Sequence, residues 1–306
     1  MNDRRRGFVL ATVLALLVIG SALMAGAFFY ALQEERLGRN AQAAARALAA
    51  AESGADLALA GWVPGSAERL APGDSLTGAV ALPSGAGSAD VTLAALGDQL
   101  VLIRAQGEDP THVARRGVAV LGRLLLPPFA APAALTVTRA PAGSLAGAAD
   151  GSAHGVDGWT CAADSEVNVP LVAPWGGAWS DYDSLAARAV VGPVMPDASE
   201  PAVRVAGDLR LTGASGVGVL LVDGDATLDG TTLVGILMVR GTLRVTGASS
   251  RLVGAVRAGA VWADSGVLDG GPLVSWSACA VLLARRNLAG LARITGWSWA
   301  DLSGGW

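Results

Sequence analysis

Residues 8–32 read FVLATVLALLVIGSALMAGAFFYAL and contain no acidic or basic side chain. As an α-helix this stretch is about 37 Å long, which is enough to cross a bilayer with some tilt. Arg4, Arg5 and Arg6 come just before it, whereas mixed charges follow it. Because basic residues favour the cytoplasmic side, the sequence predicts a membrane-spanning helix with a cytoplasmic N-terminus and residues 33–306 exported.

Two other interpretations of this stretch are a secretory signal peptide and a buried core helix. A signal peptide has an apolar core of about 7–15 residues, followed by a cleavage site with small residues. Here the apolar run is longer and continues into further helical sequence without a break. A core helix is seldom apolar on every face over about seven turns. The membrane span is therefore the preferred interpretation.

The composition excludes some functions. The 306 residues carry a net charge of −4, and no basic block follows the first six residues, which argues against nucleic-acid binding. The two cysteines, Cys161 and Cys279, lie on the predicted exported side, where an oxidising compartment favours a disulfide between them. Two separate buried thiols are the alternative. Neither cysteine has a nearby His or Cys for metal binding, and the sequence predicts no metal and no cofactor.

The helical character continues beyond the apolar stretch. From residue 33 to residue 60 the chain is rich in Ala, Leu, Glu, Gln and Arg, and Gly61 and Pro64 then end the helix. We therefore expect one helix over residues 8–62, roughly 80 Å long, that is membrane-spanning at first and amphipathic afterwards. Small apolar residues draw a narrow stripe that favours close helix packing in a bundle. The stripe comprises Leu37, Ala41, Ala44, Leu48, Ala51, Ala55 and Leu59.

Two motifs in this helix carry a family resemblance. Arg5-Arg6-Gly7-Phe8 before an apolar run resembles a type IV prepilin cleavage site. A second stretch is similar to the N-terminal region of PilX-type minor pilins. It comprises Gln33, Glu34, Glu35, Arg36 and Asn40, followed by Ala49-Ala50-Ala51-Glu52-Ser53.

The resemblance implies that residues 1–7 are a leader and that a prepilin peptidase cuts after Gly7. It also implies that the new N-terminal amine, on Phe8, is methylated. The expected location is the inner membrane before assembly, with the C-terminal part periplasmic or extracellular, and a filament afterwards. The expected partners are other pilins or pseudopilins, the peptidase and a pilus assembly platform.

Thr12 departs from this family pattern. Most major pilins carry a glutamate at the fifth residue after the cut, where it pairs with a neighbour's N-terminal amine. The matching residue here is Thr12. A hydroxyl cannot neutralise an amine in hydrocarbon, where an unpaired charge is costly. Thr12 therefore favours a tip or initiating subunit over a repeating interior subunit, and leaves open that the chain is not processed.

Downstream, residues 65–130 are expected to form the small antiparallel sheet that packs on a pilin helix. Residues 65–88 are rich in Pro, Gly and Ser and read as a loop. Alternating strands are predicted over residues 90–95, 99–106 and 113–125. Prolines at 127, 128 and 132 then mark a boundary.

Residues 131–306 contain an internal repeat with a constant interval between copies. The heptapeptide that begins at Gly207 recurs at Gly224 and again at Gly241, and the strand-like stretch 217–222 recurs at 234–239. A later copy at 253–256 follows two extra residues. Stacked copies of such short strands predict a β-solenoid, with a β-sandwich as the alternative. The amphipathic stretch 280–291 is expected to be a short helix that caps an open end. The overall fold class is therefore α+β.

Little in the sequence points to catalysis, and the chain is predicted not to be an enzyme. His112 and His154 are far apart, and a hydrolase built on His154, Asp157 and Ser152 lacks a nucleophile elbow. The corner residues Asp223, Asp225 and Asp229 are better explained by turns than by calcium. Trp175, Trp179, Trp297 and Trp299 are read as covering the solenoid ends, with sugar stacking as the alternative.

The expected function is that of a minor pilin or pseudopilin that initiates, caps or modifies a type IV pilus-like filament. The alternative is an unprocessed single-pass membrane anchor that displays an adhesive solenoid.

Overall fold

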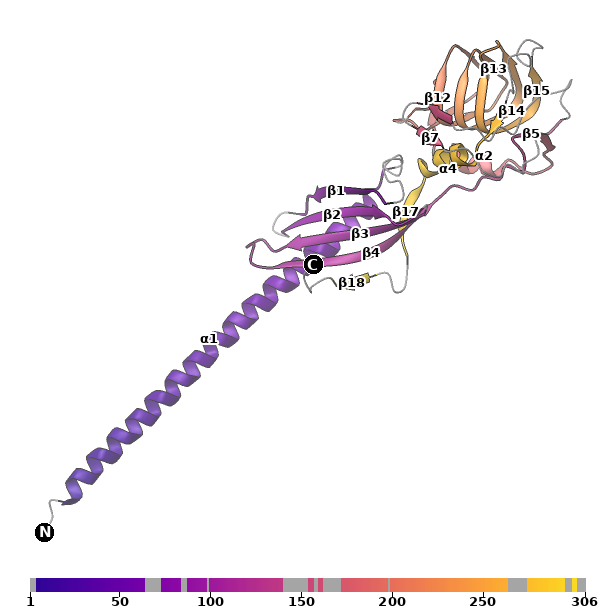
Figure 1. The fold of residues 1–306 in the computed structure, drawn as a ribbon. Coiled ribbons are helices and arrows are strands. Elements are labelled where there is room, and N and C mark those ends of the chain that lie inside the picture. Colours follow the sequence, from indigo (N-terminus) through magenta and orange to yellow (C-terminus); the bar gives the residue numbers. More distant parts are fainter. Residues whose placement is uncertain are drawn as a thin grey trace.

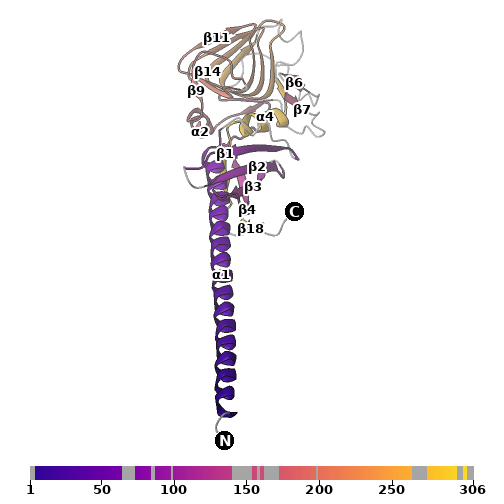
Figure 2. The ribbon, with the colours of Figure 1, turned by 90° about the vertical axis from the view of Figure 1, so that its left-hand side faces the viewer.

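The computed structural model describes residues 4–63, 73–83, 87–97, 99–139, 154–156, 159–161, 172–197, 199–263, 274–294 and 299–301. Its fold is α+β, with a long N-terminal helix, an antiparallel sheet and a C-terminal β-solenoid (Figure 1). The helix α1 spans Arg4–Ala60 without interruption, as the sequence predicts. Its N-terminal half projects away from the rest of the chain in both views (Figures 1 and 2).

The C-terminal part of α1 packs on the antiparallel sheet. The buried residues of the helix are small: Ala43, Ala47, Ala50, Ala51, Gly54 and Ala55. The backbones approach so closely that a Cβ built on Gly107 would lie 2.2 Å from the Ala47 carbonyl oxygen. The alanine stripe is thus wholly or partly covered from Ala44 onward by the chain's own sheet, whereas its first members, Leu37 and Ala41, stay exposed. This part of the stripe serves packing within the chain rather than a bundle of helices.

The antiparallel sheet has the order β1-β2-β3-β4-β17, with β18 also paired to β4. Its first four strands are β1 (Ser75–Val80), β2 (Ser88–Ala95), β3 (Leu100–Glu108) and β4 (Arg115–Leu125). In β3, buried and exposed residues alternate, and Val101, Ile103 and Ala105 face α1 in one apolar cluster. β1 falls inside the stretch 65–88 that the sequence suggested as a loop. Its side chains are largely exposed, as is typical of an edge strand, so the apolar signal was weak.

The last strands of the chain return to this sheet. β17 (Gly290–Arg293) and β18 (Trp299–Asp301) both pair antiparallel with β4. The stretch 131–306 is therefore not one domain: the described residues after Ala289 extend the sheet, and the solenoid lies between β4 and β17. The local sequence could not show this, because the residues of such a short strand do not specify which sheet the strand joins.

The solenoid has two walls of parallel strands. One wall contains β10 (Ala202–Val205), β12 (Ser215–Val222) and the first parts of β14 (Thr232–Thr246) and β15 (Arg251–Ala263). The other wall contains β11 (Leu209–Thr212), β13 (Ala226–Asp229) and the second parts of β14 and β15. Leu220 pairs with Leu237 at the predicted repeat interval, and Leu237 pairs with Val256 after the two extra residues. Parallel pairing at these intervals excludes the β-sandwich.

The corners of the coils explain why Gly and Asp recur. The Asp208 carboxylate accepts the Asp225 backbone N–H at 2.8 Å, and the Asp225 carboxylate accepts that of Thr242 at 2.6 Å. A Cβ on Gly224 would lie 2.2 Å from the first carboxylate, and one on Gly241 equally close to the second. Glycine therefore leaves room for an aspartate that ties each coil to the next. Asp225 was expected to serve its own turn, whereas the bond that its carboxylate makes here is to the backbone of the next coil.

Two helices cover the outer face of the wall that contains β12. They are α2 (Ser180–Ala186) and α4 (Ala278–Arg286). The strands beneath them are buried on both faces, because Leu220 and Leu237 point to the solenoid interior while Leu221 and Met238 pack against the helices. The helix predicted over 280–291 is present as α4 but ends at Arg286, since Gly290 already begins a strand, and it lies across the side of several coils rather than over an open end. The unbroken apolar run of β12 signals such a doubly buried strand.

Shorter strands complete the solenoid region. β5 (Leu135–Val137), β8 (Val172–Pro174), β9 (Val190–Val191) and β16 (Val274–Trp276) extend the parallel wall, while β6 (His154–Val156) and β7 (Trp159–Cys161) form a separate pair. Cys279, in the first turn of α4, is disulfide-bonded. Cys161, the other cysteine, ends β7, and its side chain is outside the described part.

Polar contacts hold the junction between sheet and solenoid. The Trp62 indole N–H donates to the Ala289 carbonyl oxygen at 2.8 Å, and the Arg285 guanidinium donates to that of Pro127 at 2.9 Å. Arg257, only 1% exposed, lies 3.7 Å from the ring centroid of Trp175 and 3.2 Å from the Asp181 carboxylate. The first two contacts involve the segments that lead from β4 into the solenoid and from the solenoid back to β17. The contacts of Arg257 hold α2 and Trp175 against the coils.

Candidate functional site: the exposed half of helix α1

The most conspicuous surface of the molecule is the N-terminal half of α1. From Leu10 to Gln42 almost every side chain is exposed, including large apolar ones such as Leu17 at 64% and Phe29 at 68%. This helix is long and apolar enough to cross a membrane. An isolated helix that exposes this much apolar surface to water is unfavourable, so the segment needs lipid or other apolar helices around it.

The polar groups within this segment are compatible with hydrocarbon. The helix satisfies the backbone donors and acceptors internally, which is the requirement for a segment in lipid. The Ser21 hydroxyl donates to the Val18 carbonyl oxygen at 2.9 Å, so it is not left unpaired. A shallow groove surrounds Gly20 and Ser21, bordered by Leu17 and Met24. Small residues of this kind allow a second helix to approach closely in a membrane.

Charged residues mark the end of the apolar segment. Glu34, Glu35, Arg36 and Arg39 are all exposed, and Arg39 is ion-paired with Glu35 one turn earlier. The other residues of the pilin-like motif, Gln33, Asn40 and Glu52, are exposed as well. All of them therefore lie on faces of α1 that its own sheet leaves uncovered, where a neighbouring subunit or lipid headgroups can reach them.

The residues predicted for processing lie at the start of α1. The backbone of Arg4, Arg5, Arg6, Gly7 and Phe8 is helical and continuous with the rest, but their side chains lie outside the described part of the structure. Thr12 lies on the exposed segment one turn later. The structure therefore places residues 5–8, Thr12 and the charged residues 34–39 along one continuous helix.

The turn between β3 and β4 is the part of the sheet nearest the exposed half of α1, because Gly107 contacts Ala47. Asp109 closes this turn: its buried carboxylate accepts backbone N–H groups from Thr111, Val113 and Ala114, and the Thr111 hydroxyl. The Thr111 hydroxyl first, and then the Ala114 N–H, lower the pKa of Asp109 from 3.8 to about 2.

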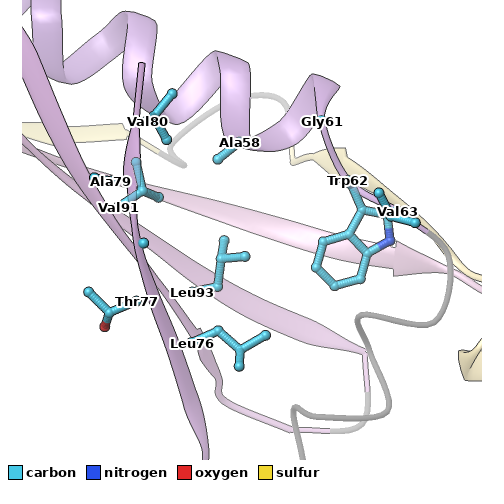
Figure 3. A pocket seen from close by; sticks show the side chains of 11 residues that line it. Ala58, Gly61, Trp62, Val63, Leu76, Thr77, Ala79, Val80, Val91 and Leu93 are labelled. Carbon is cyan, nitrogen blue, oxygen red and sulfur yellow. The ribbon is translucent and has the colours of Figure 1, made fainter. Parts of the chain in front are cut away.

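An apolar pocket of about 250 Å³ lies at the opposite end of the sheet. Figure 3 shows it between the end of α1, with Ala58 and Trp62, and the strands that carry Leu76 and Leu93. One of these strands, β1, forms the edge of the sheet. Its lining within the described part is mostly aliphatic and contains no acidic side chain, histidine or cysteine.

Of the two histidines considered for catalysis, His112 is the one whose side chain the structure describes. His112 is exposed, has a φ of 58°, and lies 3.2 Å from the Glu108 carboxylate. The side chain of His154 is outside the described part, as are Ser152 and Asp157. Asp223 binds Arg204 and the Tyr182 hydroxyl. Within the described ranges no group of three or more His, Cys, Asp or Glu side chains could hold a metal.

The four tryptophans that the sequence singled out fall into two groups. Trp175 and Trp179 are half-buried and pack against Arg257 and Tyr182 beside the wall covered by α2. They pack on the side of the coils rather than over an end. The side chains of Trp297 and Trp299 are outside the described part. Trp262, which the sequence did not single out, lies on the outer face of the opposite wall. The repeat interval provides no signal for it, because the alignment of Trp262 with Arg244 depends on a register shift between Val239 and Thr242 that the repeat does not show.

Comparison with known proteins adds no identification, because no protein-family model, curated protein or solved structure matches this chain.

Proposed function

We propose that this chain is a minor pilin or pseudopilin that initiates, caps or modifies a type IV pilus-like filament after prepilin peptidase cleavage. The observation that carries the proposal is the division of α1 into two halves. Residues 10–42 expose apolar side chains on every face, whereas residues 43–60 pack on a sheet through alanine and glycine. A filament subunit needs both halves, because its helix lies in lipid before assembly and among other helices afterwards.

The cleavage motif supports processing. Under the proposal the peptidase removes residues 1–7, and the methylated Phe8 begins the mature chain. The N-terminus then starts on the cytoplasmic side of the inner membrane, and the sheet and solenoid lie in the periplasm before assembly. The disulfide of Cys279 is in keeping with an oxidising compartment of this kind.

Thr12 supports a place at the tip or in initiation rather than in the shaft. A subunit inside the filament has a neighbour's N-terminal amine close to its fifth residue, and a carboxylate there neutralises the charge. A threonine offers no charge, so a copy with nothing stacked above it avoids the mismatch. The large solenoid, which would crowd a closely packed shaft, fits the same position.

Co-expression with a prepilin peptidase tests the proposal. Intact mass spectrometry should show loss of residues 1–7 and one added methyl group on Phe8. Gly7→Val should block processing, while Gly26→Ala, a change in the same helix at a site with no neighbour within 4 Å, should be processed normally. An intact Met1 in a host whose own prepilins are cut would favour the unprocessed anchor.

The filament role has its own test. Deletion of the protein in the native host should reduce the number of surface filaments, and antibodies should label filament ends in wild-type cells. Filaments unchanged in number, together with a protein absent from purified filaments, would overturn the role even if cleavage occurs.

A further inference from the structure

The wall of the solenoid that contains β11 and β13 has an exposed polar outer face. Leu228, Leu243 and Val245 point into the core. The residues that alternate with them along each strand, such as Thr227 and Arg244, point outward. No helix covers this wall in the described part of the chain, in contrast to the wall under α2 and α4. Figures 1 and 2 place β13 and β11 on the side of the solenoid that faces away from α1 and the antiparallel sheet.

The strand register aligns four outward residues in one row. Arg210 pairs with Thr227, Thr227 with Arg244, and Arg244 with Trp262. Parallel strands lie about 4.8 Å apart, so the row extends for about 14 Å across four coils. A straight row of this length, with one side chain per coil, matches an extended chain better than a compact ligand.

A cavity of about 320 Å³ opens at the Trp262 end of the row. Its lining includes Asp225, Thr227, Thr242, Arg244 and Trp262. The exposed Arg244 guanidinium lies 4.0 Å from the centroid of the Trp262 ring, so it covers one face of the indole. In the described chain, β16 pairs with Leu252–Gly254 of β15, and no strand adjoins Trp262 on its other side.

The chemistry of this cavity selects among ligand classes. A polyanion would be repelled by the Asp225 carboxylate, and a cation would be repelled by the Arg244 guanidinium. An apolar ligand would displace water from the second oxygen of the Asp225 carboxylate and from the Arg244 guanidinium without replacing its hydrogen bonds. A sugar chain satisfies all of them, since its hydroxyl groups both donate and accept while the flat C–H face of a ring stacks on indole.

We propose that Asp225, Thr227, Thr242, Arg244 and Trp262 form a binding site for an extended, uncharged glycan chain of the β-1,4-linked type, running along the row toward Arg210. Trp262 provides the stacking platform. Arg244 orients the indole and donates to ring hydroxyls, and Asp225 accepts from them. The site stands on the solenoid alone and does not depend on the filament role.

The test uses the full chain in a detergent without a sugar headgroup, such as lauryldimethylamine oxide, because a glycoside detergent would compete. Binding is measured by depletion on insoluble cellulose and chitin, with cellohexaose and chitohexaose as soluble competitors. Calorimetric titration with each hexasaccharide gives the affinity. The variants are Trp262→Ala, Trp262→Phe and Arg244→Ala, with Arg104→Ala, an exposed arginine on β3, as the matched control.

We expect saturable binding to at least one polymer. Trp262→Ala and Arg244→Ala should each weaken it at least tenfold, while Trp262→Phe and Arg104→Ala should stay within about threefold of wild type. Trp262→Phe and Arg244→Ala keep the test valid if Trp262→Ala does not fold. The proposal is overturned if neither polymer binds, if Trp262→Ala and Arg244→Ala bind like wild type, or if heparin binds instead and salt releases it.

Discussion

Replacing Gly107 by alanine tests how α1 is seated on its sheet. Gly107 lies in β3, and its Cα faces the helix backbone directly. A Cβ there would lie 2.2 Å from the Ala47 carbonyl oxygen and 2.3 Å from the Ala51 nitrogen. Both neighbours are backbone atoms of a continuous helix, so neither can rotate away. The helix must move outward to restore normal contact.

The loss of unfolding free energy depends on the packing between helix and sheet that this movement disrupts. It loosens the packing of Ala47, Ala51 and Ala55 against Ile103 and Ala105 of β3 and their neighbours. Overpacking of a rigid core costs about 1–3 kcal/mol and occasionally more. Since backbone opposes backbone here, we expect the upper end, about 3 kcal/mol. For a domain of about 150–250 residues this corresponds to a fall in melting temperature of about 6–12 °C.

The assay is thermal unfolding of the full chain in detergent, followed by circular dichroism, with limited proteolysis near residue 60 to report release of the helix. Gly78→Ala is the matched control, because Gly78 lies in β1 of the same sheet and has no neighbour within 4 Å of a Cβ. It should melt within about 2 °C of wild type. If Gly107→Ala melts with the control and resists protease equally, the helix is not seated as described.

Three further predictions concern stability. Asp181→Ala leaves the buried Arg257 guanidinium without its carboxylate and should cost about 3–5 kcal/mol in urea unfolding; adding Arg257→Met should recover part of that loss. Reducing the disulfide of Cys279 should destabilise wild type by up to about 4–5 kcal/mol if it closes the loop to Cys161, whereas Cys279→Ser should be insensitive to reductant. Because the pKa of Asp109 is lowered from 3.8 to about 2, its contribution is present at neutral pH and is lost as pH falls through that interval. Asp109→Asn should therefore flatten the acid limb of a melting-temperature profile, and an unchanged acid limb would contradict this role.

The sequence predicted those features that depend on local pattern. The long uncharged run over 8–32 identifies α1, and the constant interval between Gly207, Gly224 and Gly241 identifies the solenoid, because stacked coils require equivalent positions at regular spacing. Even the insertion before Arg251 is visible as a break in the repeat. The glycines at 213, 230 and 247 adopt positive φ at successive corners, which only glycine does readily.

What the sequence did not predict depends on contacts between distant parts of the chain. Nothing in Gly290–Arg293 shows that it pairs with β4, since the whole solenoid separates the two strands in the sequence. The alanine stripe was assigned to a bundle, whereas Gly107, far along the chain, admits the protein's own sheet to the same surface. Trp262 was not found either, because its pairing with Arg244 depends on the register shift between Val239 and Thr242, which the repeat interval does not reveal.

The pairing of Leu125 with Gly290 has a consequence for how this molecule is built. The chain leaves the sheet and re-enters it at two adjacent points, so the solenoid is an insertion at the tip of a β-hairpin, a place where foreign sequence is tolerated well. Rejoining Leu125 and Gly290 through a turn of about two residues would leave the helix-bearing scaffold intact. The solenoid could therefore be replaced by a different binding domain without changing helix α1 or its sheet.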